Sequence, residues 1–514
     1  QDTNPLQYAW LQLLCGPQTV IFAVGDDDQS IYAFRGADVA NMRAFERNYA
    51  KGNVIRLEQN YRSHGNILTA ANALITNNAD RLGKNLWTDA GEGELIRVFQ
   101  GVSDLDEARY IVDEIRELTR EGLSRHQMAL LYRSNAQSRV LEHALFQAGI
   151  AYRVYGGLRF FERLEVKHAL AYLRLIANQD DDTAFLRVVN FPTRGIGARS
   201  LEALQVEARQ LNSSLYNAAA SLTGKAGTAV SQFIRLIEGL RVETSGLTLP
   251  EVIDHLLDRS GLRQHYQAEK DGQDRLENLE ELVNAAATFA DDPEAAHNID
   301  RETGEATSLL ADFLAHAALE AGEHQAGDQD EAVQLMTVHS AKGLEFSAVF
   351  IVGLEQGLFP HENAMMARDG LEEERRLMYV AITRARQRLY LCHAQTRMLH
   401  GQTRYCLPSS FLDELPEALL QRINTVPAWS AGSYSTGWSD APAVDMATRV
   451  SARAAGAAES AGGFHVGQSV VHAKFGAGVI LSAEGRGDEA RVQVRFGQAG
   501  TKWLALAYAK LEAA

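Results

Sequence analysis

The hydrophobic pattern of this 514-residue chain alternates between two kinds of segment. Short apolar runs without polar alternation are typical of strands buried on both faces of a parallel sheet. Segments with helical periodicity, such as Glu107–Leu118 and Ser138–Gly149, separate most of these runs. The alternation predicts an α/β fold with parallel sheets. The apolar runs are Thr19–Val24, Leu95–Phe99, Met128–Tyr132, Val333–Val338, Ala348–Gly353 and Arg388–Cys392.

Three later regions depart from this alternation. From about Glu165 to Asp330 the helical period continues with almost no strand-like run, which predicts an all-α insertion that interrupts an α/β domain. From about Pro427 to Gly463 the chain is rich in Ala, Ser and Gly, a composition typical of a flexible linker. Beyond it, short strand-like runs alternate with Gly turns, and this pattern predicts a small β-barrel.

The distribution of charge along the sequence is more informative than the net charge of the chain. A net charge of −16 argues at first against a nucleic-acid partner, because Lys and Arg supply affinity for phosphates. Twelve acidic residues against one Arg lie between Asp291 and Glu331, whereas Leu371–Arg404 holds seven Arg against three Glu. A polyanion responds to the local field, so the net charge does not exclude nucleic acid.

Membrane and metal chemistry find little support in the sequence. No apolar run approaches the roughly 20 residues that a membrane-spanning helix needs, so we expect a cytoplasmic protein with no membrane partner. Cys15, Cys392 and Cys406 lack paired metal-ligand spacing. We interpret them as reduced structural thiols and expect no disulfide framework or zinc site built on cysteine.

The first chemical cluster is GDDDQSIYAFRGAD, Gly25 to Asp38. It follows the first predicted strand, and open α/β sheets bind ligands at the carboxyl ends of their strands. Gln29 can donate or accept a hydrogen bond, which suits a terminal phosphate or an attacking water. Tyr32 and Phe34 offer flat faces on which unpaired bases can stack. In the alternative, the aspartates cap a helix and the rings belong to the core.

Two further clusters offer groups for a nucleotide. LEQNYRS, Leu57 to Ser63, places a Tyr beside an Arg, which suits stacking on a purine and contact with a phosphate; a surface ion pair is the alternative. TVHSAKGLEF, Thr337 to Phe346, offers His339, Lys342 and Glu345 around Gly343. The glycine permits close approach of a ligand and the carboxylate suits a ribose hydroxyl, with a helix N-terminus bearing incidental charges as the alternative.

The fourth cluster is EEERRLMYVAITRARQRL, Glu372 to Leu389. On a helix, Arg376, Tyr379, Thr383 and Arg384 fall on neighbouring faces, so an Arg can be presented to an adjoining domain. Such an Arg can act as an arginine finger on a transferring phosphoryl group. A solvated helix with Glu–Arg pairs is the alternative for much of this run.

Together and in this order, the clusters resemble motifs III to VI of superfamily 1 helicases, and in particular the UvrD/PcrA/Rep group. The resemblance covers nearly the whole chain. QDTN at the N-terminus resembles the tail of the Walker B motif, and LLYRSNAQSR and YGGLRFFERLEVKHALAYLR are also similar to this group.

The resemblance implies two RecA-like P-loop NTPase motor domains, an all-α insertion and a small Tudor-like or SH3-like β-barrel. We expect residues 1–62 to be the C-terminal part of the first RecA-like domain (1A), and 63–165 with 331–415 to form the second (2A). The helical insertion (2B) would span 166–330, a flexible linker 416–461, and the barrel 462–514. The implied activity is ATP-dependent 3′-to-5′ DNA translocation and unwinding in repair and replication.

The resemblance also implies roles for individual residues, with ATP and Mg²⁺ as cofactors. Gln29, Arg62 and Arg384 would contact the γ-phosphate, Tyr61 would stack on adenine, and Glu345 would hold the ribose. The residues implied for DNA are Tyr32, Phe34, Arg35, Arg133, Asn135, His339 and Lys342 on the single strand, and Arg194, Gly195 and Gly197 of TRGIGARS on duplex phosphates. The implied partners are single-stranded DNA and single-strand/duplex junctions, RNA polymerase through the barrel, and repair proteins.

The sequence departs from this family pattern in two places. It contains no GxxxxGK[ST] segment, and the acidic pair expected ahead of QDTN is absent, so we expect a truncated chain that does not turn over ATP alone. A non-catalytic module that binds DNA or RNA polymerase is the alternative; a helicase–nuclease motor is disfavoured, because a linker and a barrel follow the fourth cluster. Phe34 stands where the group commonly has Trp.

Overall fold

The computed structural model describes residues 1–16, 18–79, 81–270, 272–291, 308–322, 331–367, 369–399 and 402–424, together with strand segments between 460 and 513. The chain divides into two compact units, Gln1–Val426 and Pro427–Ala514. Each unit is described by itself.

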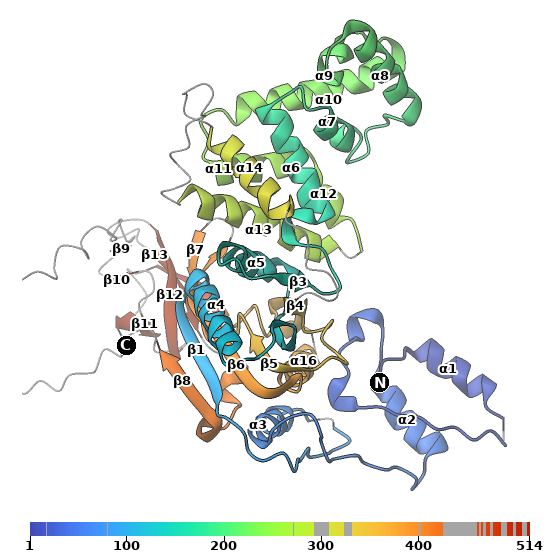
Figure 1. The fold of residues 1–514 in the computed structure, drawn as a ribbon, viewed down its shortest axis with the longest axis vertical. Coiled ribbons are helices and arrows are strands. Elements are labelled where there is room, and N and C mark those ends of the chain that lie inside the picture. Colours follow the sequence, from blue (N-terminus) through green and yellow to red (C-terminus); the bar gives the residue numbers. More distant parts are fainter. Residues whose placement is uncertain are drawn as a thin grey trace, which may run out of the picture. The chain divides into compact units, whose positions relative to one another are not determined.

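A predominantly parallel sheet is the centre of the first unit (Figure 1). Its order is β3-β4-β2-β5-β6-β1-β8, with every neighbouring pair parallel, and β7 is added antiparallel to β6. The prediction of an α/β fold is therefore confirmed. The strands are β1 (Ile96–Ser103), β2 (Met128–Tyr132), β3 (Tyr152–Val154), β4 (Val333–Thr337), β5 (Phe346–Ile351), β6 (Ala385–Leu399), β7 (Gln402–Tyr405) and β8 (Leu420–Asn424).

Helices cover both faces of this sheet, which explains why its central strands lack polar alternation. On one face α4 (Asp104–Arg120) and α5 (Ser138–Gln147) share a hydrophobic core with the strands. On the other face the core includes α3 (Gly65–Ile75) and α16 (Gly370–Ile382). Every residue of β2 and β5 is buried as a result.

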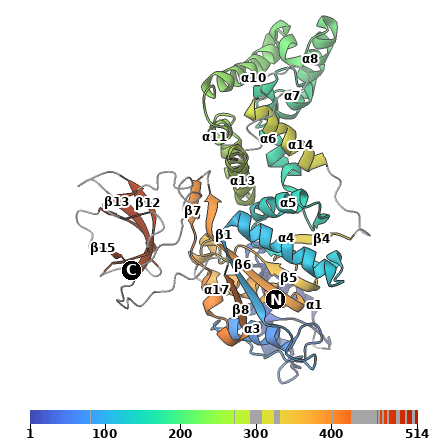
Figure 2. The same cartoon turned by 60° about the vertical axis from the view of Figure 1, so that its left-hand side comes forward.

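A block of helices enters the chain between β3 and β4 (Figure 2). Among the described residues from 155 to 332 there is no strand. Because β3 and β4 are hydrogen-bonded neighbours, the block interrupts the sequence without interrupting the sheet. It has its own core, which includes Tyr172, Phe185 and Phe233. Its helices are α6 (Leu164–Ala177), α7 (Asp182–Val188), α8 (Ala198–Leu211), α9 (Leu215–Ala218), α10 (Gly224–Glu243), α11 (Leu249–Arg259), α12 (Leu262–Gln267), α13 (Gly272–Ala290) and α14 (Leu309–Gly322).

The N-terminal segment contains α1 (Pro5–Leu14), α2 (Ala40–Tyr49) and two short 3₁₀ turns, η1 (Asp27–Gln29) and η2 (Ala33–Arg35). The prediction of a buried strand at Thr19–Val24 is wrong. These residues form no strand, and Val20, Phe22 and Val24 are 95%, 88% and 84% exposed. A strand needs a hydrogen-bonded neighbour and apolar cover, and no described segment supplies either to residues 19–24.

The start of the predicted linker also differs from the structure. We expected it at residue 416, but Leu420–Asn424 forms β8 and pairs with β1 at the edge of the sheet. The run LQRIN is short and partly polar, so the sequence pattern missed it. Most of the predicted linker, residues 425–459, lies outside the described residues.

In the second unit, all the residues that the structure describes belong to β-strands. Its five-stranded antiparallel sheet has the order β14-β13-β12-β11-β15, and a separate pair joins β9 and β10. Its strands are β9 (Ser460–Ala461), β10 (Phe464–His465), β11 (Ser469–His472), β12 (Gly476–Glu484), β13 (Arg491–Phe496), β14 (Gly500–Ala505) and β15 (Leu511–Ala513). In the described part of the whole chain, no helix has the length and apolar character needed to cross a membrane.

Candidate nucleotide and DNA site

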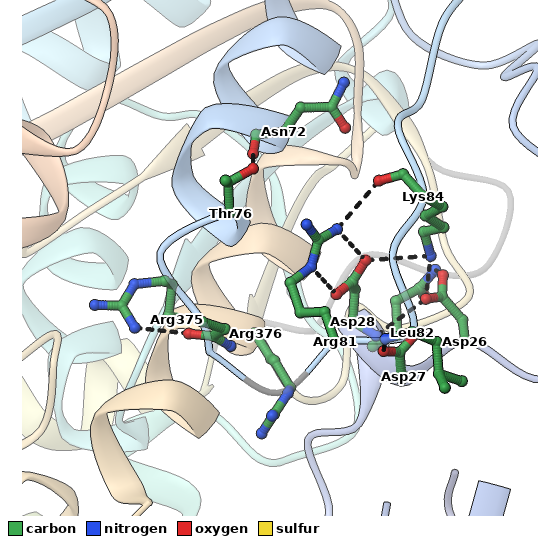
Figure 3. Close-up of polar contacts among 12 residues, drawn as sticks. Asp26, Asp27, Asp28, Asn72, Thr76, Arg81, Leu82, Lys84, Arg375 and Arg376 are labelled. Carbon is green, nitrogen blue, oxygen red and sulfur yellow. Dashed lines mark hydrogen bonds and ion pairs between the residues drawn. The ribbon is translucent and has the colours of Figure 1, made fainter. Parts of the chain in front are cut away.

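Two of the three consecutive aspartates at the start of the Gly25–Asp38 turn, Asp26 and Asp28, are anchored by basic residues (Figure 3). Arg81 donates two hydrogen bonds of 2.8 Å to the two carboxylate oxygens of Asp28, and Lys84 pairs with Asp26. Asp26 also caps η1 by accepting a hydrogen bond from the main-chain N–H of Asp28. The capping alternative therefore describes part of this turn. Sequence reasoning missed Arg81 and Lys84, since no spacing rule links residues more than 50 positions apart.

The turn also packs against α16, the helix of the fourth cluster. The main-chain N–H of Ala33 donates to Glu373 Oε1 at 2.9 Å, and Lys84 Nζ lies 5.8 Å from the centre of the Tyr379 ring. Burial, followed by the charges of Asp26 and Asp28, holds the pKa of the Tyr379 hydroxyl above its usual value. The first and fourth clusters thus form one continuous site.

Gln29 lies where the turn meets the third cluster. Its side-chain amide donates to Asp26 Oδ2 at 2.5 Å, and its main-chain oxygen accepts from Lys342 Nζ at 2.8 Å. Lys342 also pairs with Asp2 at 2.8 Å and lies 4.8 Å from the centre of the Tyr32 ring. One ammonium group therefore contacts both the glutamine and the first aromatic ring of the turn.

The aromatic residues of the turn present a partly open surface. Phe34 is 65% exposed and meets His339 edge-on with 5.4 Å between ring centres, while Tyr32 is half-buried. The guanidinium of Arg35 lies 5.7 Å and 5.4 Å from the centres of the Tyr32 and Phe34 rings. Burial, aided by Arg133 and Arg35, lowers the pKa of His339 to about 3, so this imidazole is neutral near pH 7.

Arg62 and Arg384, which come from segments far apart in the sequence, both lie close to Glu345. Arg62 Nε lies 2.5 Å from Glu345 Oε2, and Arg384 donates to the main-chain oxygen of Leu344 beside it at 3.0 Å. The bond from Arg62 lowers the pKa of Glu345. Arg384 is buried, and this burial together with the charge of Arg62 lowers its pKa to about 10. Two guanidinium groups beside one carboxylate leave local positive charge that suits an anion.

The ring of Tyr61 stands beside this charged group and is open to solvent. The side chain is 83% exposed, and its hydroxyl donates to Gln59 Oε1 at 2.9 Å. An open ring next to an Arg can accept a flat base without rearrangement of the core.

The side chains of two predicted DNA contacts, Arg133 and Arg194, bond to the protein, as does the main chain of Asn135. Arg133 forms a paired contact with the buried carboxylate of Glu374 at 2.8–3.0 Å, and the main-chain oxygen of Asn135 accepts from Arg163 at 2.9 Å. Arg194 donates to the Tyr172 hydroxyl at 2.7 Å and to three main-chain oxygens of the helical block. These geometries favour structural roles for the Arg133 and Arg194 guanidinium groups in this conformation.

Gly195 and Gly197 remain open at the surface of the helical block. Gly195 has a φ of +75°, and Gly197 precedes the first turn of α8. Both glycines are exposed, and a Cβ at either would meet nothing within 4 Å. The loop therefore presents main-chain N–H groups at a helix N-terminus, which suits a phosphate.

Comparisons with known proteins extend over these clusters. A model of the UvrD-like helicase C-terminal domain matches residues 55–396, and one of the UvrD/REP helicase N-terminal domain matches residues 1–50. The chain belongs to the UvrD-like helicases. A model of the PcrA/UvrD tudor domain also matches residues 466–512. The clusters of this UvrD-like helicase fall within the first two matched ranges.

Named relatives of this UvrD-like helicase are enzymes that act on DNA. The chain is 48% identical over 520 residues to DNA helicase II of Escherichia coli, a match that covers all of this chain and 69% of the relative. It is 39% identical over 521 residues to the ATP-dependent DNA helicase PcrA of Bacillus subtilis, with the same coverage of both chains. The relative in Haemophilus influenzae, also named DNA helicase II, is 44% identical.

Proposed function

We propose that this chain forms the DNA-translocating part of an ATP-dependent DNA helicase that moves 3′ to 5′ and acts in repair and replication. The observation that carries the proposal is the position of Lys342, which contacts both the main chain of Gln29 and the ring of Tyr32. A single group therefore lies between the residue proposed for the γ-phosphate and the residues proposed for DNA.

On the nucleotide side, the two guanidinium groups of Arg62 and Arg384 would hold the terminal phosphate. Arg384 is held by three hydrogen bonds, to Val380 O, Leu344 O and Thr383 Oγ1, so its position is fixed before a ligand arrives. Glu345 is ionised and can accept a ribose hydroxyl once Arg62 turns to the phosphate. The open ring of Tyr61 would receive the adenine.

On the DNA side, Phe34 and Tyr32 would stack on bases while Arg35, which lies near both rings, would neutralise backbone phosphate. His339 supports Phe34 as a neutral ring. When the grip of Arg62 and Arg384 on phosphate is released, the turn and the third cluster can separate, and the bases can move past the rings. Bound ATP supplies the phosphate bond whose hydrolysis drives this release.

Mg²⁺ does not fit the acidic turn as the structure has it. Asp26, Asp27 and Asp28 are close enough to group around a cation, but Arg81 and Lys84 already neutralise Asp28 and Asp26. The main-chain N–H of Leu82 donates to Asp27 at 2.7 Å. We therefore assign no Mg²⁺ ligand within the turn.

The same proposal includes contacts away from the motor site. The main-chain N–H groups of Gly195 and Gly197 would contact duplex phosphates at a single-strand/duplex junction.

The match of residues 466–512 to the PcrA/UvrD tudor domain supports a protein-binding role for the second unit, for which we propose RNA polymerase as the partner. Co-purification of polymerase with residues 1–514, and its loss on removal of residues 460–514, would test this contact. Repair proteins are further proposed partners.

The test of the motor function compares two proteins side by side: this chain, and a version extended at its N-terminus by a GxxxxGK[ST] segment of the family. DNA-stimulated ATP hydrolysis is measured in both, and DNA binding is followed by anisotropy of a labelled single strand. We expect both to bind DNA and only the extended protein to hydrolyse ATP. Absence of hydrolysis in both, with DNA binding retained, would favour a non-catalytic DNA-binding module.

A further inference from the structure

Two histidines and a glutamate meet where the helical block contacts the sheet-bearing part of the first unit. His143 Nδ1 lies 2.6 Å from Glu320 Oε1, and His316 Nε2 lies 3.0 Å from the same oxygen. His143 belongs to α5, which follows β2, whereas His316 and Glu320 belong to α14, the last helix of the block. None of these residues takes part in the nucleotide or DNA contacts described above.

The spacing on α14 directs its polar groups to one side. Asp312, His316 and Glu320 follow one another at intervals of four residues, so they lie on one face of the helix. That face borders a cavity of about 310 Å³, and His143, Asp312, His316 and Glu320 are all among its lining residues. The cavity gives a solvated ion a route to the histidines.

The surroundings set the protonation state of the glutamate. Its side chain is buried, and although burial opposes ionisation, hydrogen bonds from His143 and His316 lower the pKa of Glu320 to about 2. The nearest lining cation, Arg139, forms an ion pair with Glu281 on α13. The cluster thus offers an anionic carboxylate and two imidazoles, and the adjacent guanidinium has its own partner.

We propose that His143, His316 and Glu320 form a binding site for a Zn²⁺-class divalent cation that links α5 to α14. Two imidazole nitrogens and a carboxylate oxygen are a ligand set that Zn²⁺ accepts, and the fourth position would be filled by water or by Asp312 from the cavity. In a tetrahedral zinc site neighbouring ligand atoms are about 3.3 Å apart. The three ligand atoms here lie within 4.8 Å of one another, so small side-chain rotations suffice.

Binding would replace the two N–H···O hydrogen bonds by metal–ligand bonds, with each imidazole offering an unprotonated nitrogen. Since the ligands come from two elements that are far apart in sequence, the cation would hold the end of the helical block against the sheet-bearing part. The phenyl ring of Phe289 on α13 lies 5.3 Å from the His316 ring centre and limits its rotation. A link of this kind would stabilise one position of the helical block.

The test uses the complete 514-residue chain, freed of metal with EDTA and titrated with Co²⁺. Bound Co²⁺ is followed by its visible d–d absorption, and Zn²⁺ is then added to displace it. We expect one equivalent to bind. His143→Gln and His316→Gln should each weaken Co²⁺ binding by at least about 10-fold. Loss of a residue that only supports a metal ligand weakens binding by about that factor, so loss of a ligand should weaken it at least as much.

His255→Gln is the matched control. His255 Nε2 lies 2.8 Å from Glu243 Oε2, the same kind of His–Glu contact, but on the surface of the helical block and next to Arg259. This variant should bind Co²⁺ as the parent chain does.

A gain of signal complements these losses. His143→Cys keeps a ligand but changes its type, so the Co²⁺ complex should acquire a near-ultraviolet thiolate-to-metal charge-transfer band, even where a Gln variant fails to fold. Absence of any d–d absorption in the parent chain would show that only hydrogen bonds join the three side chains, and it would overturn the proposal. So would a spectrum that neither Gln variant weakens and in which the Cys variant adds no band.

Discussion

Lys342 Nζ donates a 2.8 Å hydrogen bond to the main-chain oxygen of Gln29, 313 residues earlier in the sequence. The same ammonium lies over the Tyr32 ring. This contact joins the third cluster to the acidic turn and brings the proposed phosphate-sensing and base-stacking residues within one network.

Substitution Lys342→Met should weaken binding to single-stranded DNA by about 10-fold and reduce the slope of log affinity against log salt by about one, because one phosphate contact is lost. It should also reduce the DNA stimulation of ATP hydrolysis in a P-loop-containing version. Anisotropy titrations at several salt concentrations measure the effect. Lys51→Met, which removes an exposed Lys elsewhere, is the control. An unchanged salt slope for the Lys342 variant would exclude its contact with the strand.

Phe34→Ala should weaken single-strand binding by roughly 5- to 150-fold, since a stacked base contributes about 1–3 kcal/mol. Phe34→Trp should bind at least as tightly as the parent, because the larger ring offers more area. Neither change should alter thermal stability, as the side chain is largely exposed. Phe22→Ala, which removes another exposed ring, provides the comparison. Equal losses in both Ala variants would mean that Phe34 has no specific role.

Arg384→Ala in a P-loop-containing version should lower DNA-stimulated ATP hydrolysis by about 10³-fold or more, the scale on which arginine fingers act. DNA binding should change little, because Arg384 is buried and its hydrogen bonds are made within the protein. Steady-state hydrolysis and anisotropy are measured on the same preparations. Arg388→Ala, which removes an Arg of β6 that pairs with Glu94 and Glu121, should retain activity. Turnover that survives in the Arg384 variant would remove its assigned role.

Residues 19–24 should exchange their main-chain amides rapidly in this chain, because they form no strand ladder. The amides of β2, whose residues are all buried, should be protected by several orders of magnitude. Hydrogen exchange followed by mass spectrometry compares the two segments. Protection of residues 19–24 equal to that of β2 would contradict the structure of this segment.

His168 gives the helical block a specific dependence on pH. Burial lowers the pKa of this imidazole to about 4, and Nδ1 lies 2.9 Å from the Tyr266 hydroxyl. Because the folded pKa lies below the unfolded value of about 6.5, its neutral form favours folding above pH 6.5, and that stability is lost as the pH falls from 6.5 to 4. The loss should amount to roughly 1–3 kcal/mol.

Thermal unfolding between pH 7.5 and 4 checks this dependence. His168→Gln should be less stable than the parent at pH 7.5 but should lose less stability on acidification, because the replacement cannot titrate. His255→Gln, at a surface histidine, should follow the parent. Parallel pH profiles for the His168 variant and the parent would show that His168 does not titrate in this way.

The sequence by itself determined the class of fold and most of the strands. MALLY and AVFIVG have no polar alternation, which is typical of strands in a sheet that helices cover on both faces. The burial of these strands could therefore be predicted from local composition. The all-α insertion was also predictable, since its helical period continues without interruption by strand-like runs. The order of the four clusters was enough to indicate the family, because each is a local run of residues.

Only the tertiary structure decided which charges meet. Asp26 pairs with Lys84 and Asp28 with Arg81. Glu345 pairs with Arg62, and Arg133 with Glu374. Ion pairs form between groups that the fold brings within a few ångströms, and no local pattern encodes that distance. The same reason explains Thr19–Val24: its composition favours a strand, but strand formation depends on a hydrogen-bonded neighbour from elsewhere in the fold. The meeting of His143 with His316 and Glu320 likewise depends on how the helical block packs against α5.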